Sequence, residues 1–146
     1  MPTLDRLSFD NSYAGLPDIF HSRLAPTPLQ GQRLLHFNGQ AAQLLDLNPE
    51  QAAHADIADR LTGVTELPGA DPLAMAYAGH QFGGFSPQLG DGRALLLGEL
   101  IDRFGRRRDL HLKGSGRTPF SRGGDGKAAL GPVLREYLIG EAMHAL

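Results

Sequence analysis

Two glycine-rich stretches, 77–92 and 114–126, constrain the fold of this chain more than any other feature of its sequence. Fourteen of the 19 glycines lie in the second half of the chain. Glycine tolerates positive φ and lets the backbone approach other groups closely, so both stretches predict turns and loops. The apolar runs between them, 93–101 and 107–114, are typical of strands. Because Gly105 lies at a turn position between these runs, we expect an antiparallel hairpin flanked by glycine-rich loops.

Outside the hairpin, the sequence predicts short helices and one further strand, which makes the expected fold class α+β. Apolar patterns, caps and breakers give the following ranges: a strand over 31–38, a helix over 39–47 capped by Asn38, a helix from Pro49 to about Leu61, a short helix over 71–78, and a final helix from about Ala128 or Pro132 to Leu146. No repeat or interdomain linker interrupts them.

The composition excludes several classes of protein. The chain has 146 residues, of which 41% are hydrophobic and 21% charged, which is typical of one modest globular domain. No apolar run approaches the roughly 20 residues that span a bilayer, and the N-terminal residues lack signal-peptide features. We therefore expect a cytoplasmic protein without a membrane partner. The absence of cysteine excludes disulfides, thiolate nucleophiles and cysteine-ligated zinc.

The charges are divided unevenly along the chain. Residues 1–92 carry four basic and ten acidic side chains, whereas residues 93–146 carry ten basic and six acidic ones. Positive charge therefore coincides with most of the glycines, which favours the binding of an anion. Three consecutive arginines at 106–108 have no aromatic residues interleaved with them, so we expect an exposed strand edge there and not a nucleic-acid site.

A lysine at the end of the second predicted strand belongs to a candidate nucleotide site. Leu110 and Leu112 alternate with polar residues, so Lys113 lies on the face opposite the leucines. Backbone amides of the Gly-x-Gly turn at 90–92 and the lysine ammonium are both suited to contact phosphate groups. The alternatives from the residues alone are a plain tight turn and a surface lysine without a ligand.

A buried lysine needs a carboxylate to fix its position, and the final helix offers Glu136 and Glu141. These residues are five apart, about 140° around a helix, so they do not face one site together. Periodicity does not choose between them. The order of turn, lysine and helix is that of protein kinases, although the kinase motifs G-x-G-x-x-G-x-V and V-A-I-K are absent.

Several long segments of the chain resemble one protein family. They are YAGHQFGGFSPQLGDGRALLLGEL at 77–100, DLHLKGSGRTPFSRGGDGKAAL at 109–130, REYLIGEAMHAL at 135–146 and LSFDNSYAGLP at 7–17. In this order they closely resemble the selenoprotein O family of protein adenylyltransferases. The resemblance implies a protein-kinase-like N-lobe at 79–146, with a glycine-rich loop and an αC-like helix. It also implies an N-terminal extension over 1–78. The N-lobe is expected to be incomplete, because the given sequence ends before the C-lobe of the family.

The resemblance further implies an activity, cofactors and partners. Family members use ATP and Mg²⁺ to transfer AMP to the hydroxyl groups of Ser, Thr or Tyr in proteins. Carried over residue by residue, the nucleotide-contacting positions are Gly90, Gly92, Arg93, Lys113, Asp125 and Gly126, and the residue that pairs with the lysine is Glu136. Arg117 departs from the family pattern and is expected to add a cation beside the phosphates.

The family's catalytic aspartate and Mg²⁺ ligands are expected beyond Leu146, so no catalytic or metal-ligating residue is assigned within this chain. We therefore expect the 146 residues alone to be unable to transfer AMP. Two other functions stay open. One is a conventional protein kinase that transfers the γ-phosphoryl group of ATP, and the other is a non-catalytic fragment that binds nucleotide or another protein.

Overall fold

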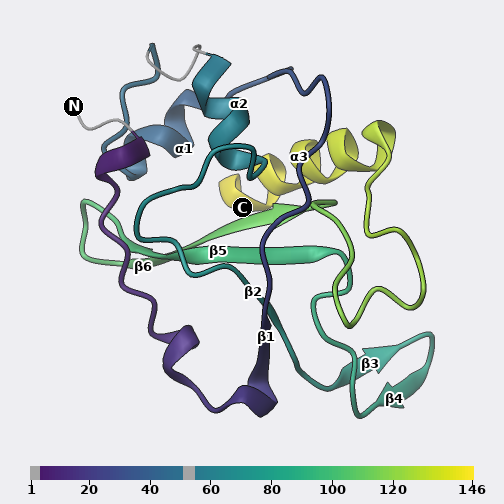
Figure 1. Cartoon of the computed structure of the whole chain (residues 1–146). Helices are drawn as coiled ribbons and strands as arrows, with labels where there is room; N and C mark the ends of the chain where they lie inside the picture. The colour runs from purple at the N-terminus through teal and green to yellow at the C-terminus, as the bar shows by residue number, and fades with distance from the viewer. Residues whose placement is uncertain (1–3, 51–54) are drawn as a thin grey trace.

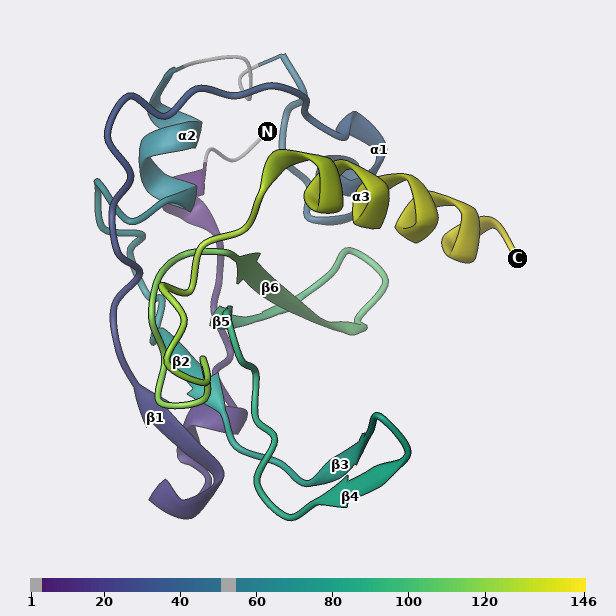
Figure 2. The same ribbon diagram turned by 90° about the vertical axis from the view of Figure 1, so that its right-hand side faces the viewer.

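The computed structural model describes residues 4–50 and 55–146 and confirms the expected α+β class, with antiparallel strand pairing. The elements in chain order are η1 (Leu4–Arg6), η2 (Tyr13–Gly15), η3 (Asp18–Phe20), β1 (His21–Arg23), α1 (Gly39–Leu44), α2 (Ala55–Leu61), β2 (Leu73–Met75), β3 (Gly79–Gln81), β4 (Gly84–Ser86), β5 (Ala94–Ile101), β6 (Arg107–Lys113) and α3 (Leu130–Ala145). The main sheet has the order β1-β2-β5-β6, and β3 and β4 form a separate pair. Helices α1, α2 and α3 lie at one end of the molecule and the β3–β4 pair at the other (Figures 1 and 2). None of the helices in these two ranges is both long and apolar enough to cross a membrane.

The hairpin predicted around Gly105 is confirmed. β5 and β6 pair from Ala94 opposite Lys113 to Ile101 opposite Arg107. Gly105 has a φ of 75° in the turn between them, in the left-handed region that favours glycine. This hairpin places Lys113 at the end of β6 nearest the two glycine-rich stretches.

Asp102 also holds this turn, with a buried carboxylate that the sequence analysis did not single out. Its Oδ1 accepts hydrogen bonds from the backbone N–H groups of Phe104 and Arg106 at 2.8 and 2.9 Å, and its Oδ2 accepts one from Arg108 at 3.0 Å. Burial acts to raise the pKa of Asp102, but these hydrogen bonds and the charge of Arg108 together hold it below its ordinary value. An ionised aspartate therefore fixes the turn together with the glycine.

β5 is buried on both faces over residues 95–100, which explains why its residues are apolar, apart from Glu99, instead of alternating with polar ones. Leu95 and Leu97 belong to the larger core cluster, to which α1 and α2 also contribute. Leu96 points to the other face, where it packs with Leu73 and Ala14. The central strand thus joins two layers of the molecule.

The helix expected over 71–78 is wrong, because this segment contains strand β2. Leu73 and Ala74 are fully buried. Ala74 lies opposite Ser22 of β1, and Leu73 lies opposite Leu96 of β5. Leucine, alanine and methionine favour a helix locally, but pairing and burial between two strands outweigh that propensity here.

The strand expected over 31–38 is also wrong, because the segment is irregular and pairs with no strand in the described part of the chain. Leu34 and Leu35 are 38% and 57% exposed. His36 instead contacts α3, with its Nε2 2.9 Å from the hydroxyl oxygen of Tyr137. A short apolar run does not form a strand without a neighbouring strand to supply hydrogen bonds.

The helix predicted after Asn38 is present as α1 and is shorter than expected. The Asn38 side chain accepts hydrogen bonds from two amides of the first turn at 3.0 and 3.1 Å, which is the geometry of an N-cap. The next expected helix ends at Leu61 as α2, while its residues 51–54 lie outside the described residues. The final helix begins at Leu130, between the two predicted starts.

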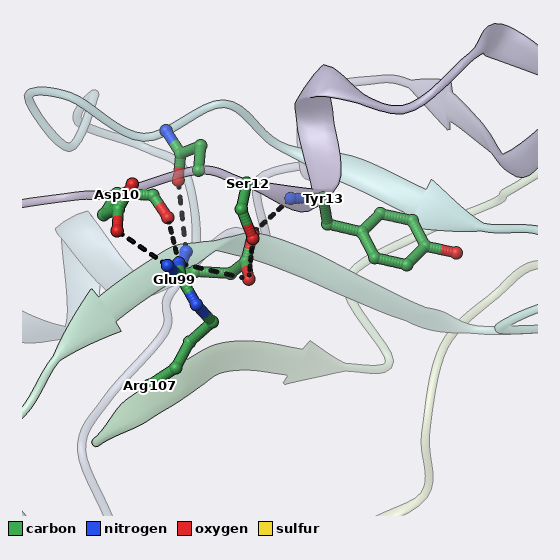
Figure 3. Close-up of polar contacts among 6 residues, drawn as sticks. Asp10, Ser12, Tyr13, Glu99 and Arg107 are labelled. Carbon is green, nitrogen blue, oxygen red and sulfur yellow. Dashed lines mark hydrogen bonds and ion pairs between the residues drawn. The ribbon is translucent and has the colours of Figure 1, made fainter.

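A buried carboxylate on β5, that of Glu99, fastens the N-terminal segment to the sheet (Figure 3). Glu99 accepts a hydrogen bond from the hydroxyl of Ser12 at 2.9 Å and another from the backbone N–H of Tyr13. The guanidinium of Arg107, on β6, lies 3.4 Å from this carboxylate and 2.7 Å from that of Asp10. Two side chains of the central hairpin, Glu99 and Arg107, therefore hold residues 10–13 in place.

Replacing Glu99 with alanine is expected to lower the free energy of unfolding by about 2–4 kcal/mol, because it leaves the Ser12 hydroxyl and the Tyr13 N–H without their acceptor. Urea denaturation followed by circular dichroism measures this change. Asp109→Ala is the matched control, since Asp109 lies opposite Glu99 on β6 and is exposed. Equal losses in the two variants would contradict the role of Glu99.

Candidate functional site

An open pocket of about 570 Å³ lies between the turn at 89–93 and the loop at 114–127. The six positions that the resemblance assigns to nucleotide contact all line this pocket: Gly90, Gly92, Arg93, Lys113, Asp125 and Gly126. They come from the turn before β5, the end of β6 and the loop before α3. Residues up to 36 positions apart in the chain are therefore brought to one cavity by the β5–β6 hairpin.

The turn at 89–93 is held by the chain that follows β2. The backbone N–H groups of Leu89 and Gly90 both donate to the carbonyl of Tyr77, at 2.7 and 3.1 Å. Gly90 has a φ of 62°, and a Cβ at this position would lie 2.3 Å from the ring of Phe120. Packing against Phe120 therefore requires glycine at this position. The N–H of Gly90 is already hydrogen-bonded to Tyr77.

The loop at 114–127 is closed on itself and tied to the turn. The N–H of Gly116 donates to the carbonyl of Gly126 at 3.3 Å. The Thr118 hydroxyl donates to the carbonyl of Gly92, and the Arg93 guanidinium donates to the carbonyl of Lys127 at 3.2 Å. Both glycine-rich stretches predicted from the sequence thus form connected walls of one pocket.

Lys113 is paired with a carboxylate of α3. Its Nζ lies 3.0 Å from Oε1 of Glu136, and both side chains are about half exposed. Glu141, the other candidate on this helix, instead accepts a hydrogen bond from Asn38 at 2.7 Å. An ion pair this exposed contributes little to folding stability, so its main effect is to orient the ammonium group at the pocket wall.

The pocket carries an excess of positive charge. Its cationic side chains are those of Arg93, Lys113, Arg122 and Lys127. Two carboxylates also line it, but each accepts a backbone hydrogen bond at 2.9 Å: Asp91 from Met75 and Asp125 from Lys127. Cations and glycine turns in one concave site suit an anion with several phosphate groups.

Sequence reasoning missed Arg122, Lys127, Tyr77 and Phe120, all of which line the pocket. The positive charge of the second glycine-rich stretch indicated that cations such as Arg122 and Lys127 would be near the site. It did not indicate that their side chains point into the pocket. Burial, followed by the nearby charges of Asp91 and Tyr13, raises the pKa of the Tyr77 hydroxyl. The hydroxyl of Tyr77 therefore keeps its proton at physiological pH.

Arg117 was expected beside the phosphates and is placed elsewhere. Its guanidinium donates to the carbonyls of Gly124 and Gly123 at 2.8 and 3.3 Å. It does not belong to the residues that line the pocket. Arg117 therefore braces the loop through two of its five N–H groups.

The residues in 4–50 and 55–146 include no cluster of three or more His, Asp or Glu side chains placed to hold a metal ion. Mg²⁺ prefers an octahedral set of oxygen ligands. The described carboxylates of the pocket do not supply that set by themselves. The residues of this chain fit the anionic part of a nucleotide better than they fit a magnesium ion.

Comparison with known proteins identifies relatives over nearly the whole chain. The chain matches the family model described as protein adenylyltransferase SelO over residues 3–146. It is 62% identical over 94% of its length to proteins named protein nucleotidyltransferase YdiU from Bradyrhizobium sp. BTAi1 and Rhodopseudomonas palustris HaA2. A protein of the same name from Rhizobium rhizogenes K84 is 63% identical over 96% of the chain. The chain spans 28% of the length of each of these relatives. From its match to the family model and from these identities, the chain belongs to the SelO family of protein nucleotidyltransferases.

Proposed function

We propose that this chain is the nucleotide-binding N-terminal part of a protein adenylyltransferase, which transfers AMP from ATP to Ser, Thr or Tyr hydroxyls of other proteins. The observation that carries the proposal is the position of Lys113, paired with Glu136 at 3.0 Å on the wall of a cation-lined pocket. Family membership supports it as well. In this reading the hairpin, the glycine-rich turn and α3 correspond to the strands, the glycine-rich loop and the αC helix of a kinase-like N-lobe.

The proposed reaction is the attack of a protein hydroxyl oxygen on the α-phosphorus of ATP. A bond forms between that oxygen and the α-phosphorus, the bond to the β-phosphate oxygen breaks, and pyrophosphate leaves. The pocket's four cations would hold the triphosphate and stabilise the charge that develops on the leaving pyrophosphate. Mg²⁺ would neutralise further phosphate charge when bound. The group that accepts the hydroxyl proton is not assigned to these residues.

ATP labelled at either the α- or the γ-phosphorus tests this proposal against a conventional kinase. The protein expressed from its complete reading frame is incubated with each label and a mixture of acceptor proteins. We expect the α-label on the acceptors and no γ-label, because only AMP transfer leaves the α-phosphorus on the hydroxyl. Transfer of the γ-label would support a kinase instead, and ATP binding without transfer of either label would support a non-catalytic module.

The 146-residue chain serves as the control in this assay. We expect it to transfer neither label, because the proposal places the proton acceptor and the metal ligands outside it. Label transfer by this chain would show that its own residues supply both.

A further inference from the structure

Asp91 lies between the two glycines of the pocket turn, yet its carboxylate is bonded to the sheet. The side chain is 5% exposed. Its Oδ2 accepts a hydrogen bond from the backbone N–H of Met75 at 2.9 Å, and its own N–H donates to the Met75 carbonyl at 2.9 Å. Asp91 therefore forms hydrogen bonds with Met75 of β2 through both its side chain and its backbone.

The two hydrogen bonds between Asp91 and Met75 attach the turn at 89–93 to β2. The carbonyl of Tyr77, two residues after Met75, accepts the N–H groups of Leu89 and Gly90. The carbonyl of Asp91 accepts the N–H of Ala94, the first residue of β5, at 3.0 Å. Every one of these bonds is made to β2, to the segment after it or to β5, so the position of the turn is set by the main sheet.

A second partner of Asp91 lies on the strand that carries Lys113. The Nε2 of His111 is 3.5 Å from Oδ2 of Asp91. His111 and Lys113 are two residues apart on β6 and therefore lie on the same face of the sheet. The carboxylate of Asp91, in the turn, thus contacts both β2 and β6, and β6 carries the lysine.

A carboxylate with so little exposure is costly to bury without polar partners, so its hydrogen bond to Met75 and its contact with His111 favour a single arrangement of the two strands. Catalytic sites need their groups held to within a fraction of an ångström, and supporting side chains supply that precision. No step of the proposed reaction uses Asp91 itself.

We propose, building on the proposed function, that Asp91 is a positioning residue. By joining Met75 and His111, it holds the turn at 89–93 and Lys113 at the separation at which both contact the phosphates of one nucleotide. Removing the carboxylate leaves only backbone hydrogen bonds between the turn and the segment from Met75 to Tyr77. The turn then becomes more mobile, and ATP binding must order it.

The variants Asp91→Ala, Asp91→Asn and His111→Leu test this proposal in the protein expressed from its complete reading frame. Isothermal titration calorimetry measures the dissociation constant for ATP, and hydrogen–deuterium exchange without nucleotide measures the mobility of residues 89–94. The control is Asp109→Asn, which changes an exposed acid on the same face of β6.

We expect Asp91→Ala to weaken ATP binding by about tenfold or more and to speed exchange at 89–94, because a buried charge-assisted hydrogen bond is lost. Asp91→Asn should recover part of both effects, since its amide oxygen still accepts from Met75. His111→Leu should show a smaller loss of affinity. The control should match the wild type in both measurements.

Unchanged affinity in Asp91→Ala, with a wild type that binds ATP, would overturn the positioning role. A wild type that does not bind ATP would overturn the proposed function, and the exchange measurement would then decide the role of Asp91. Faster exchange confined to 89–94 would support the role, and unchanged exchange would refute it. If Asp91→Ala does not fold, Asp91→Asn and His111→Leu give the same decision.

Discussion

Replacing Lys113 with alanine is expected to lower AMP transfer by the protein from its complete reading frame by roughly 10²- to 10³-fold, the usual cost of removing one group that stabilises transition-state charge. The ammonium lies at the pocket wall and is oriented by Glu136 at 3.0 Å. Its loss removes one of the four cations available to the phosphates. The measurement is kcat/KM for transfer of the α-label from ATP.

The effect should be on the reaction and not on folding. The Lys113–Glu136 pair is about half exposed, so the free energy of unfolding should change by less than about 1 kcal/mol in Lys113→Ala. Glu141→Gln is the matched control, because this residue lies on the same helix but contacts Asn38. It should retain near-normal transfer. Near-normal transfer in Lys113→Ala itself would show that the lysine does not serve the reaction.

Replacing Gly126 with alanine is expected to disrupt the backbone conformation of the loop at 114–127 and to abolish most ATP binding. Gly126 is buried and has a φ of 72°. A Cβ built there would lie 1.8 Å from the backbone oxygen of Gly116, a separation that no side-chain rearrangement relieves. We expect the free energy of unfolding to fall by roughly 2–4 kcal/mol. Thermal denaturation and calorimetric titration with ATP measure the two effects.

Gly123→Ala is the control that separates the steric clash at position 126 from the cost of a positive φ. Gly123 lies in the same loop with a φ of 77°, but a Cβ there would meet nothing within 4 Å. Gly123→Ala should lower the free energy of unfolding by only about 1–2 kcal/mol, because a residue with a side chain is strained in a left-handed conformation. The difference between the variants then measures the contact between Gly126 and Gly116. If both variants lose the same stability, that contact does not govern the loop.

The features that could be predicted depend on a few neighbouring residues. Asn38 caps a helix because its side chain reaches amides of the next turn. The β5–β6 hairpin follows from two apolar runs and a glycine at the turn. The charge and glycine content of the second half predicted that this part of the chain favours an anion, and the cavity lined by Arg93 and Lys113 lies there.

The features that could not be predicted depend on partners distant in the sequence. The segment around Leu73 has the composition of a helix, and only its position between β1 and β5 makes it a strand. Arg117 and Arg122 lie in the same predicted loop, yet backbone carbonyls hold Arg117 while Arg122 lines the pocket. Charge along the sequence does not give the direction of a side chain.

The sequence by itself determined where this chain turns, where its central hairpin lies and which half carries the excess of positive charge, because these properties follow from backbone freedom, alternation and charge at adjacent positions. Periodicity left Glu136 and Glu141 open as partners of Lys113 and the family resemblance indicated Glu136, which the tertiary structure places beside the lysine. Tertiary structure alone decided that the Asp91 carboxylate contacts both Met75 of β2 and His111 of β6. These choices depend on how α3 and the strands pack, which brings together groups that are not neighbours along the chain.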